Sequence, residues 1–403
     1  MAVAPLTSTQ NVPFLFQQRV LLNVRYWQRF VTAKKGDVAG LDCERERIVT
    51  AIAFGLDQAE ARGEALALLK DYSPHLEWRG FWEDWGRLLN RASESAWQAG
   101  DTAAGIILTI QRARLAQGQG NLEAAIDHYR QAVRLARRID QRYQQARAYS
   151  NLGYLYIQQG HFWRAEVLCG AALHIFEAFD NDHGRAHTEN HLGLLYLELT
   201  QWDQARQHLE RACTIWRSMN DPCGLLFGQI NLGFLYIEMG EPDQALPCFE
   251  KARQLAQQTG AELELGQIYR DLGVVYRLKG DPIQAEAYAR QAEQIFRRFS
   301  SLRKLSSVWN NLGLAYLDQG KWADARRYFD ASLEIRHKLK LEYEKMRNLV
   351  YLIEYDLARG NWDQAVKKLY ELESLHSTGQ SPRLTRYLQS ILVKYQSTLA
   401  IAA

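Results

Sequence analysis

Apolar residues recur at three- and four-residue spacing through much of the chain, and this pattern itself repeats every 40 residues. Ala148, Leu152 and Tyr156, for example, fall on one face of a helix with one buried side. Each clear period contains a Leu-Gly pair followed three residues later by tyrosine, with the glycines at Gly153, Gly193, Gly233, Gly273 and Gly313. Such self-similarity is typical of arrays in which each unit buries its apolar face against the next. The pattern predicts an all-α fold, a right-handed α-solenoid of about eight helix pairs.

Small residues predict where the two helices of a pair approach most closely. An alanine follows each of these glycines after twelve residues, at Ala165, Ala205, Ala245, Ala285 and Ala325. A glycine that faces an alanine lets two backbones touch, so a leucine at Gly233 or Gly273 should cost about 1–3 kcal/mol. A second glycine series predicts left-handed caps where helices end, and it is interrupted at Thr200; its members are Gly80, Gly120, Gly160, Gly240, Gly280, Gly320 and Gly360.

The repeat pattern also divides the chain. We expect the array to run over residues 62–375, with its clearest units in residues 142–340. Residues 13–61 fall outside the repeat and predict a helical extension of two helices, with Asp42 as the N-cap of the second. Residues 1–12 are predicted to be disordered, and residues 376–403 to form a capping helix.

Composition adds few constraints. The 403 residues are 47% hydrophobic and 24% charged, with a net charge of +3, which by itself favours neither nucleic acid nor a membrane as partner. The five cysteines form no CxxC pair, and no apolar stretch is long enough to span a membrane. No nucleophile or phosphate-loop motif occurs either. We therefore expect a cytoplasmic protein that is not an enzyme and uses no cofactor or metal.

The repeat resembles the tetratricopeptide repeat. Its consensus is met in full by one unit, through Trp309, Leu312, Gly313, Tyr316, Ala325 and Phe329. Other units depart from it: Glu189 and Gln229 replace the aromatic residue. The 40-residue length is similar to that of kinesin light chain and the Rap-type peptide receptors. The N-terminal region looks like the one that precedes the repeat arm of STAND-type signalling ATPases, although no ATPase half is present. The resemblance implies a scaffold, adaptor or signalling sensor that works by protein–protein interaction.

A ladder of polar side chains runs along the first helices, at the residue before each Leu-Gly pair: Asn151, His191, Asn231, Asp271 and Asn311. The resemblance implies that these helices line a concave groove and that such an asparagine holds the main chain of an extended peptide. An amide offers both a donor and an acceptor to a peptide bond. Units about 10 Å apart would place one rung per three peptide residues, which advance about 3.3 Å each. Alternatively, these side chains bond to the adjacent helix and fix the stacking of units.

Neighbouring positions supply further candidates for partner binding: Arg147, Tyr154, Asn190, Phe227, Ile230, Phe234, Arg270 and Asn310. The segment from Phe227 to Phe234 forms an apolar centre flanked by Arg147 and Arg270. It could hold an aromatic or aliphatic anchor, with the arginines meeting a carboxylate. Alternatively, another part of the chain, such as the N-terminal helices, covers this apolar centre.

Two other functions stay open at this point. Basic helix faces could contact nucleic acid, and their arginines include Arg134, Arg137, Arg138, Arg297, Arg298 and Arg303. The chain could also be a structural scaffold subunit that uses its outer faces. His183, His187 and His191 share one helix face, but no accompanying carboxylate signature favours a metal site.

Overall fold

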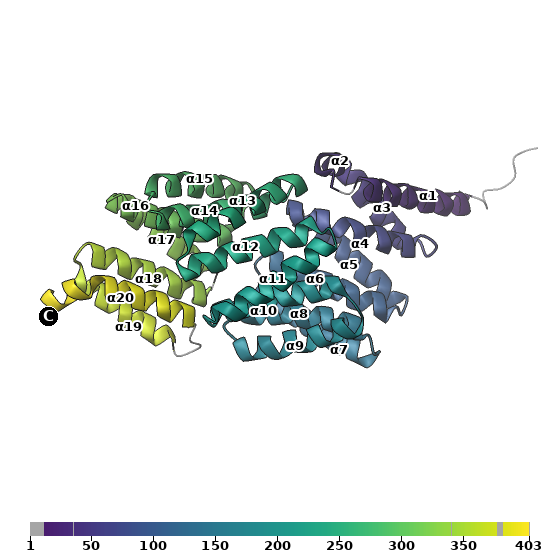
Figure 1. Cartoon of the computed structure of the whole chain (residues 1–403). Helices are drawn as coiled ribbons and strands as arrows, with labels where there is room; N and C mark the ends of the chain where they lie inside the picture. Colours follow the sequence, from purple (N-terminus) through teal and green to yellow (C-terminus); the bar gives the residue numbers. More distant parts are fainter. Residues whose placement is uncertain (1–11, 35, 340, 377–381, 403) are drawn as a thin grey trace, which may run out of the picture. The chain divides into compact units, whose positions relative to one another are not determined.

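The computed structural model describes residues 12–34, 36–339, 341–376 and 382–402. This part of the chain forms twenty α-helices and no strand, which confirms the predicted all-α class (Figure 1). None of these helices is long and apolar enough to cross a membrane. Residues 1–11 lie outside the described part, so the predicted disorder of residues 1–12 concerns it only at Val12, where the first helix begins.

Contacts between residues divide the chain into two compact units, Met1–Gln144 and Gln145–Ala403. The boundary falls in the first turn of α8 (Arg142–Gln158). The first unit contains α1 (Val12–Ala33), α2 (Val38–Cys43), α3 (Arg45–Asp57), α4 (Arg62–Arg79), α5 (Trp82–Gln98), α6 (Thr102–Gly118) and α7 (Leu122–Arg138). Its core joins α1, α3, α4 and α5 around Ile48, Leu68 and Trp85, which are all fully buried.

The first unit corrects two details of the predicted N-terminal extension, which contains the three helices α1, α2 and α3 instead of two. Asp42 is not an N-cap: it lies inside the short helix α2, where its carboxylate binds His75 (2.8 Å) and Arg79 (2.9 Å) of α4. Asp37 caps α2 instead by accepting a hydrogen bond from the backbone N–H of Gly40. The sequence pattern placed an N-cap before the apolar run but could not show that two basic groups of a later helix compete for the same carboxylate.

The second unit continues the helix pairs. Its members after α8 are α9 (Phe162–Ala178), α10 (Asp182–Glu198), α11 (Trp202–Ser218), α12 (Pro222–Met239), α13 (Pro242–Thr259), α14 (Glu262–Leu278), α15 (Pro282–Arg298), α16 (Leu302–Asp318), α17 (Trp322–Lys338), α18 (Glu342–Ala358), α19 (Trp362–His376) and α20 (Pro382–Ala402). Within each pair the first helix packs closely on the second. Local chemistry fixes the starts of several helices: Asp281 caps α15, and Pro242 and Pro282 stand in the first turns.

Glycines of the Leu-Gly pairs lie where paired helices touch. A Cβ added at Gly273 would stand 3.1 Å from the backbone oxygen of Ala285, and one at Gly153 would stand 2.5 Å from Cys169 Sγ and 3.3 Å from the Ala165 oxygen. The predicted pairing of glycine with alanine is therefore confirmed at Gly153, Gly193 and Gly273, whereas the nearest atoms to a Cβ at Gly233 and Gly313 belong to Phe249 and Phe329, four places after the alanine. Larger side chains at these glycines would force the two helices apart.

Helix α20 closes the array beside α18 (Figure 1). Its apolar face carries Leu384 and Ile391, which are buried in a cluster with Met346, Val350 and Ile353 of α18. One face of α20 thus packs on α18. Its first turn also reaches α10 and α12, which positions it over part of the first-helix surface.

Candidate functional site

The polar ladder links the first helices of successive pairs. Asn231 of α12 donates to Asn190 Oδ1 of α10 (2.8 Å), and Asn311 of α16 donates to the backbone oxygen of Arg270 in α14 (3.1 Å). His191 Nδ1 lies 3.0 Å from Ser150 Oγ in the same relation between α10 and α8. Each of these bonds joins residues 41 positions apart. The ladder therefore contributes to the stacking of units, as one of the two interpretations expected.

Two rungs differ from this arrangement because of their neighbours. Asn151 donates to the Arg147 oxygen in its own helix (2.8 Å). The residue 41 positions before Asp271 is the apolar Ile230, whose side chain offers no hydrogen bond, and Asp271 pairs with the adjacent Arg270 (2.7 Å). Burial raises the pKa of Asp271 above its ordinary value, while Arg270 opposes that shift. The carboxylate and guanidinium thus form a local ion pair at the edge of the groove.

The predicted apolar centre separates into buried and accessible parts. Ile230 is 3% exposed and belongs to the core of the α12–α14 region, whereas Phe227 and Phe234 are half-buried. Arg383 of α20 stacks on Phe234, with its guanidinium carbon 4.5 Å from the ring centroid. At Phe234, another part of the chain thus covers the apolar centre, and the covering segment is the first turn of α20.

Arg383 fixes the first turn of α20 to two repeats. Its guanidinium binds Glu198 of α10 (2.7 Å) and Glu238 of α12 (2.8 Å). Arg386 stacks on Trp202 at 4.9 Å, and the Tyr387 hydroxyl donates to Glu354 Oε2 (3.1 Å). Arg383 thus closes one side of a pocket on the first-helix surface.

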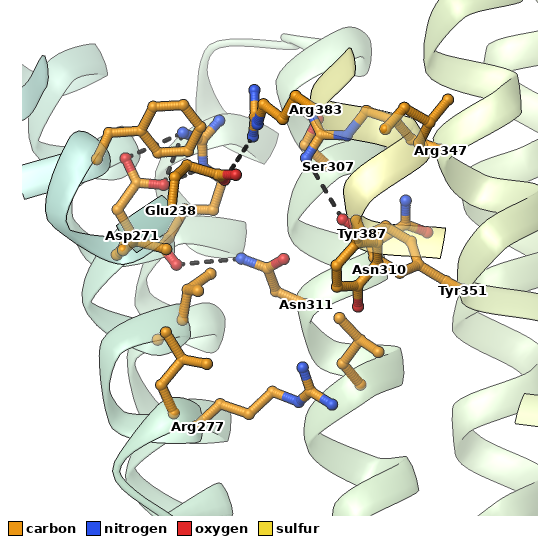
Figure 2. Close-up of a pocket in the computed structure, with 18 of the residues that line it drawn as sticks. Glu238, Asp271, Arg277, Ser307, Asn310, Asn311, Arg347, Tyr351, Arg383 and Tyr387 are labelled. Carbon is orange, nitrogen blue, oxygen red and sulfur yellow. Dashed lines mark hydrogen bonds and ion pairs between the residues drawn. The ribbon is translucent and has the colours of Figure 1, made fainter. Parts of the chain in front are cut away.

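This pocket lies between α12, α14, α16, α18 and α20 and has a volume of about 420 Å³ (Figure 2). Five predicted site residues line it: Phe234, Arg270, Asp271, Asn310 and Asn311. Eight others lie elsewhere on the first helices: Arg147, Asn151, Tyr154, Asn190, His191, Phe227, Ile230 and Asn231. In Figure 2, Asn311 points into the space between Asp271 on one side and Tyr351 and Tyr387 on the other. The pocket therefore combines amides, aromatic rings and arginines over an apolar floor that includes Val274 and Leu314.

Sequence reasoning missed several pocket residues. Arg277 binds Asp318 (2.6 Å) and Glu354 (3.4 Å). A signal for this pair exists in the repeat register. Arg277 stands where other units carry Ile157, Leu197, Ile237 and Leu317, and Glu354 stands where they carry Tyr154, Leu194, Phe234, Val274 and Leu314. Charged residues at two otherwise apolar register positions indicate a local polar function. The pocket residues of α20, Arg383 and Tyr387, have no such register signal because that helix lies outside the repeat.

The three histidines do not converge. The His183 and His187 rings lie 4.6 Å apart, whereas His191 turns to Ser150 and stacks on Tyr154 with ring centroids 5.0 Å apart. Within the described residues, no group of three or more potential ligand side chains is placed to hold a metal ion. The polar contacts of His191 account for its position in the ladder.

Three of the arginines that could contact nucleic acid, Arg297, Arg298 and Arg303, are paired with acidic residues. Arg297 binds Glu293 (2.8 Å), Arg298 binds Glu262, and Arg303 binds Glu344 (2.5 Å). Ion pairing within the chain competes with phosphate contacts, which nucleic-acid binding requires in number. These three arginines therefore give no support to a nucleic-acid interface.

Comparisons with solved structures agree with this architecture. A Rap protein complexed with Competence and Sporulation Factor superposes with a TM-score of 0.66 at 14% identity, covering 92% of this chain and 99% of that one. NprR in complex with its cognate peptide NprX gives 0.60 at 16% identity, covering 88% and 99%. Aspartyl phosphate phosphatase F from Bacillus subtilis gives 0.56 at 15% identity, covering 94% and 98%. At these identities the likeness concerns the fold. No curated protein matches the sequence.

Fold and repeat chemistry together define a helical repeat protein. Three tetratricopeptide repeat family models match the chain, at residues 105–178 and 226–298, at 185–222 and at 306–338. Together they match more than half of the 403 residues. The chain belongs to the tetratricopeptide repeat proteins.

Proposed function

We propose that this protein is a regulatory adaptor or sensor that binds an extended peptide, or a segment of a protein partner, along its first helices. The pocket under α20 would hold the anchoring side chains. The observation that carries the proposal is this pocket, because it brings an apolar floor, amides and charged groups of four successive units and of α20 into one space of about 420 Å³. Ligand sites have this size and this mixture of apolar lining with a few polar groups.

The ladder is compatible with a second role in binding. Asn311 is half-buried and lines the pocket while it holds one bond to the Arg270 backbone. An amide has two N–H donors and an oxygen acceptor, so one interhelical bond leaves capacity for a peptide group. Two structural neighbours, the Rap protein and NprR, are complexes with a named factor or peptide, which supports a ligand of this kind here.

The test is affinity capture from the native cell lysate, read by mass spectrometry with and without nuclease. Wild type is compared with an Asn231→Ala, Asn311→Ala double variant and with Val274→Trp, which fills the pocket without removing a hydrogen bond. A matched control changes two exposed residues on second helices, Gln204→Ala and Gln291→Ala. We expect a protein partner that wild type and control retain and that both groove variants lose.

Other outcomes identify the competing functions. Partners retained by Val274→Trp and by the double variant would contradict groove binding and direct attention to the outer faces, as a scaffold requires. Recovery that disappears with nuclease would favour nucleic acid. Melting curves of each variant show whether a loss of binding follows from a loss of folding.

A further inference from the structure

One end of the pocket contains a buried cation, Arg336 of α17. Its residue is 3% exposed, and its guanidinium reaches the space between α16 and α18. Nε lies 3.3 Å from Ser306 Oγ, Nη2 lies 3.5 Å from Ser307 Oγ, and Nη1 donates to the backbone oxygen of Glu344. Asn310, with its amide oriented by Asn348 and Ser332, presents its oxygen to the same guanidinium at 3.0 and 3.1 Å. These acceptors are neutral oxygens.

The charges around Arg336 do not compensate it fully. Burial lowers the pKa of Arg336 to about 10; Glu344 opposes this shift, and Arg347 and Arg303 add to it by repulsion. Glu344 is itself engaged with Arg303 at 2.5 Å. A buried cation in this setting is more stable when a further anion is present.

The hydroxyl of Tyr351 lies in the same positive electrostatic field. Burial alone would raise the pKa of its hydroxyl, but Arg347, Arg336 and Arg383 lower that pKa below its ordinary value. Arg347 donates to the hydroxyl (3.3 Å), and both residues line the pocket (Figure 2). Arg336 and Arg347 thus make the α16–α18 end of the pocket favourable for negative charge.

We propose that this end of the pocket binds an oxyanion of the ligand, a carboxylate or a phosphate group, through Arg347, with the buried charge of Arg336 beside it. The inference rests on the proposed function and specifies the chemistry of the ligand. The planar fork of Arg347 matches two oxygens of either group, while Arg336, whose N–H groups bond to neutral oxygens, contributes its positive charge. The apolar floor at Val274 and Leu314 then receives the neighbouring part of the ligand.

Selection of peptides tests the proposal. A random decapeptide library with free carboxyl termini is selected against the full chain in five forms: wild type, Arg336→Gln, Arg347→Gln, Arg347→Lys and Arg327→Gln. Arg327 is the matched control, since it lies on the same helix as Arg336 with a side chain that is 68% exposed. Arg347→Lys keeps the charge and removes the fork, so it stays informative where loss of charge affects folding.

The best wild-type binder is then made in three versions: as selected, with Asp and Glu changed to Asn and Gln, and with an amidated C-terminus. We expect at least one neutral version to bind wild type and Arg327→Gln about tenfold more weakly. That penalty should fall below about threefold with Arg347→Gln and lie between the two with Arg347→Lys. The version that loses affinity shows whether a side chain or the chain terminus supplies the carboxylate.

Inorganic phosphate at 10 mM serves as competitor, and competition that Arg347→Gln abolishes would identify phosphate as an alternative source of the oxyanion. Neutral peptides that bind wild type as tightly as the charged parent, together with no competition by phosphate, would overturn the oxyanion site and leave the groove function standing. A wild-type selection that enriches no peptide would instead contradict the proposed function itself.

Discussion

Individual residues in the turns set the regularity of this chain. A residue with positive φ ends a helix at every twentieth position from Gly80 to Gly320, and again at Gly360, among the positions that the structure describes. Half of these positions were visible in the sequence as glycines 40 residues apart. The others include Asp140, Asp180 and Asn220, which tolerate this conformation because their short polar side chains bond locally. These helix ends were not predicted, because the repeat pattern identified positive φ by glycine alone.

Thr200 is the strained member of this series. Its φ is +59°, a conformation that costs a β-branched residue roughly 1–2 kcal/mol. We expect Thr200→Gly to raise the free energy of unfolding by about 0.5–1 kcal/mol, after the greater freedom of glycine in the unfolded chain is subtracted. Denaturant unfolding measures the change. Gly160→Thr is the reciprocal control and should destabilise; an unchanged midpoint for Thr200→Gly would show that the turn is not strained.

His191 should make stability depend on pH. Burial lowers its pKa from 6.5 to about 4, so the folded state favours the neutral ring. A depressed histidine pKa contributes stability above the unfolded value of 6.5, and this contribution is lost as the pH falls toward 4. One pKa unit corresponds to about 1.4 kcal/mol, so the loss over this range amounts to a few kcal/mol.

The variant His191→Asn, which restores the residue that other rungs carry, should therefore lose less stability than wild type between pH 7 and pH 5. Thermal melts at both pH values measure the difference, with the exposed His161→Asn as control. Equal losses in wild type and His191→Asn would place the pH sensitivity elsewhere.

Pairs of helices are the next level of organisation, and their spacing depends on which glycines face a neighbour. Gly273 of α14 faces the backbone of α15, whereas a Cβ at Gly170 in α9 would meet nothing within 4 Å. We expect Gly273→Leu to destabilise the protein by about 1–3 kcal/mol by overpacking. Gly170→Ala should stabilise it by about 0.5–1 kcal/mol, because alanine is the better helix former. Denaturation midpoints decide; a stabilising Gly273→Leu would mean that the pair can open without cost.

Sequence and structure agree at this level for a physical reason. The 40-residue register depends on contacts within one pair and with the next, and these contacts recur at fixed spacing, so periodicity alone predicts helices such as α14 and α15. The pocket depends on contacts that do not recur. Asn310, Asn311 and Asp271 were predicted because they belong to the register, while Arg336 and Arg383 required knowledge of which distant helices meet. The prediction that Asp42 is an N-cap was wrong for the same reason, since its partners lie on another helix.

At the scale of the second unit, α20 forms one side of the pocket. Arg383 is the cation shared by Glu198 and Glu238, and its side chain is only 11% exposed. Replacement by Gln would leave two partly buried carboxylates near each other without it, which is unfavourable. We expect Arg383→Gln to increase hydrogen exchange in residues 383–393 about tenfold, equal to about 1.4 kcal/mol of local stability.

Mass spectrometry of peptic fragments measures this exchange, and Gln389→Ala, an exposed change on the same helix, is the control. Unchanged exchange in Arg383→Gln would show that the apolar face of α20 alone holds the helix in place.

The bonds of Arg383 also bear on how the repeats share mechanical load. In a stack of helix pairs each pair ordinarily contacts only the next, so the stability of the stack is a sum of the stabilities of single pairs and of the interfaces between neighbours. Here the Arg383 side chain binds residues 185 and 145 positions earlier in the sequence, and so it links α20 to α10 and α12. These ion pairs connect the two ends of the intervening series of helix pairs. A pulling force, or a ligand that pushes these helices apart, must act on every helix pair between α10 and α20 at once. These repeats should therefore unfold together and should not fray from the C-terminal end.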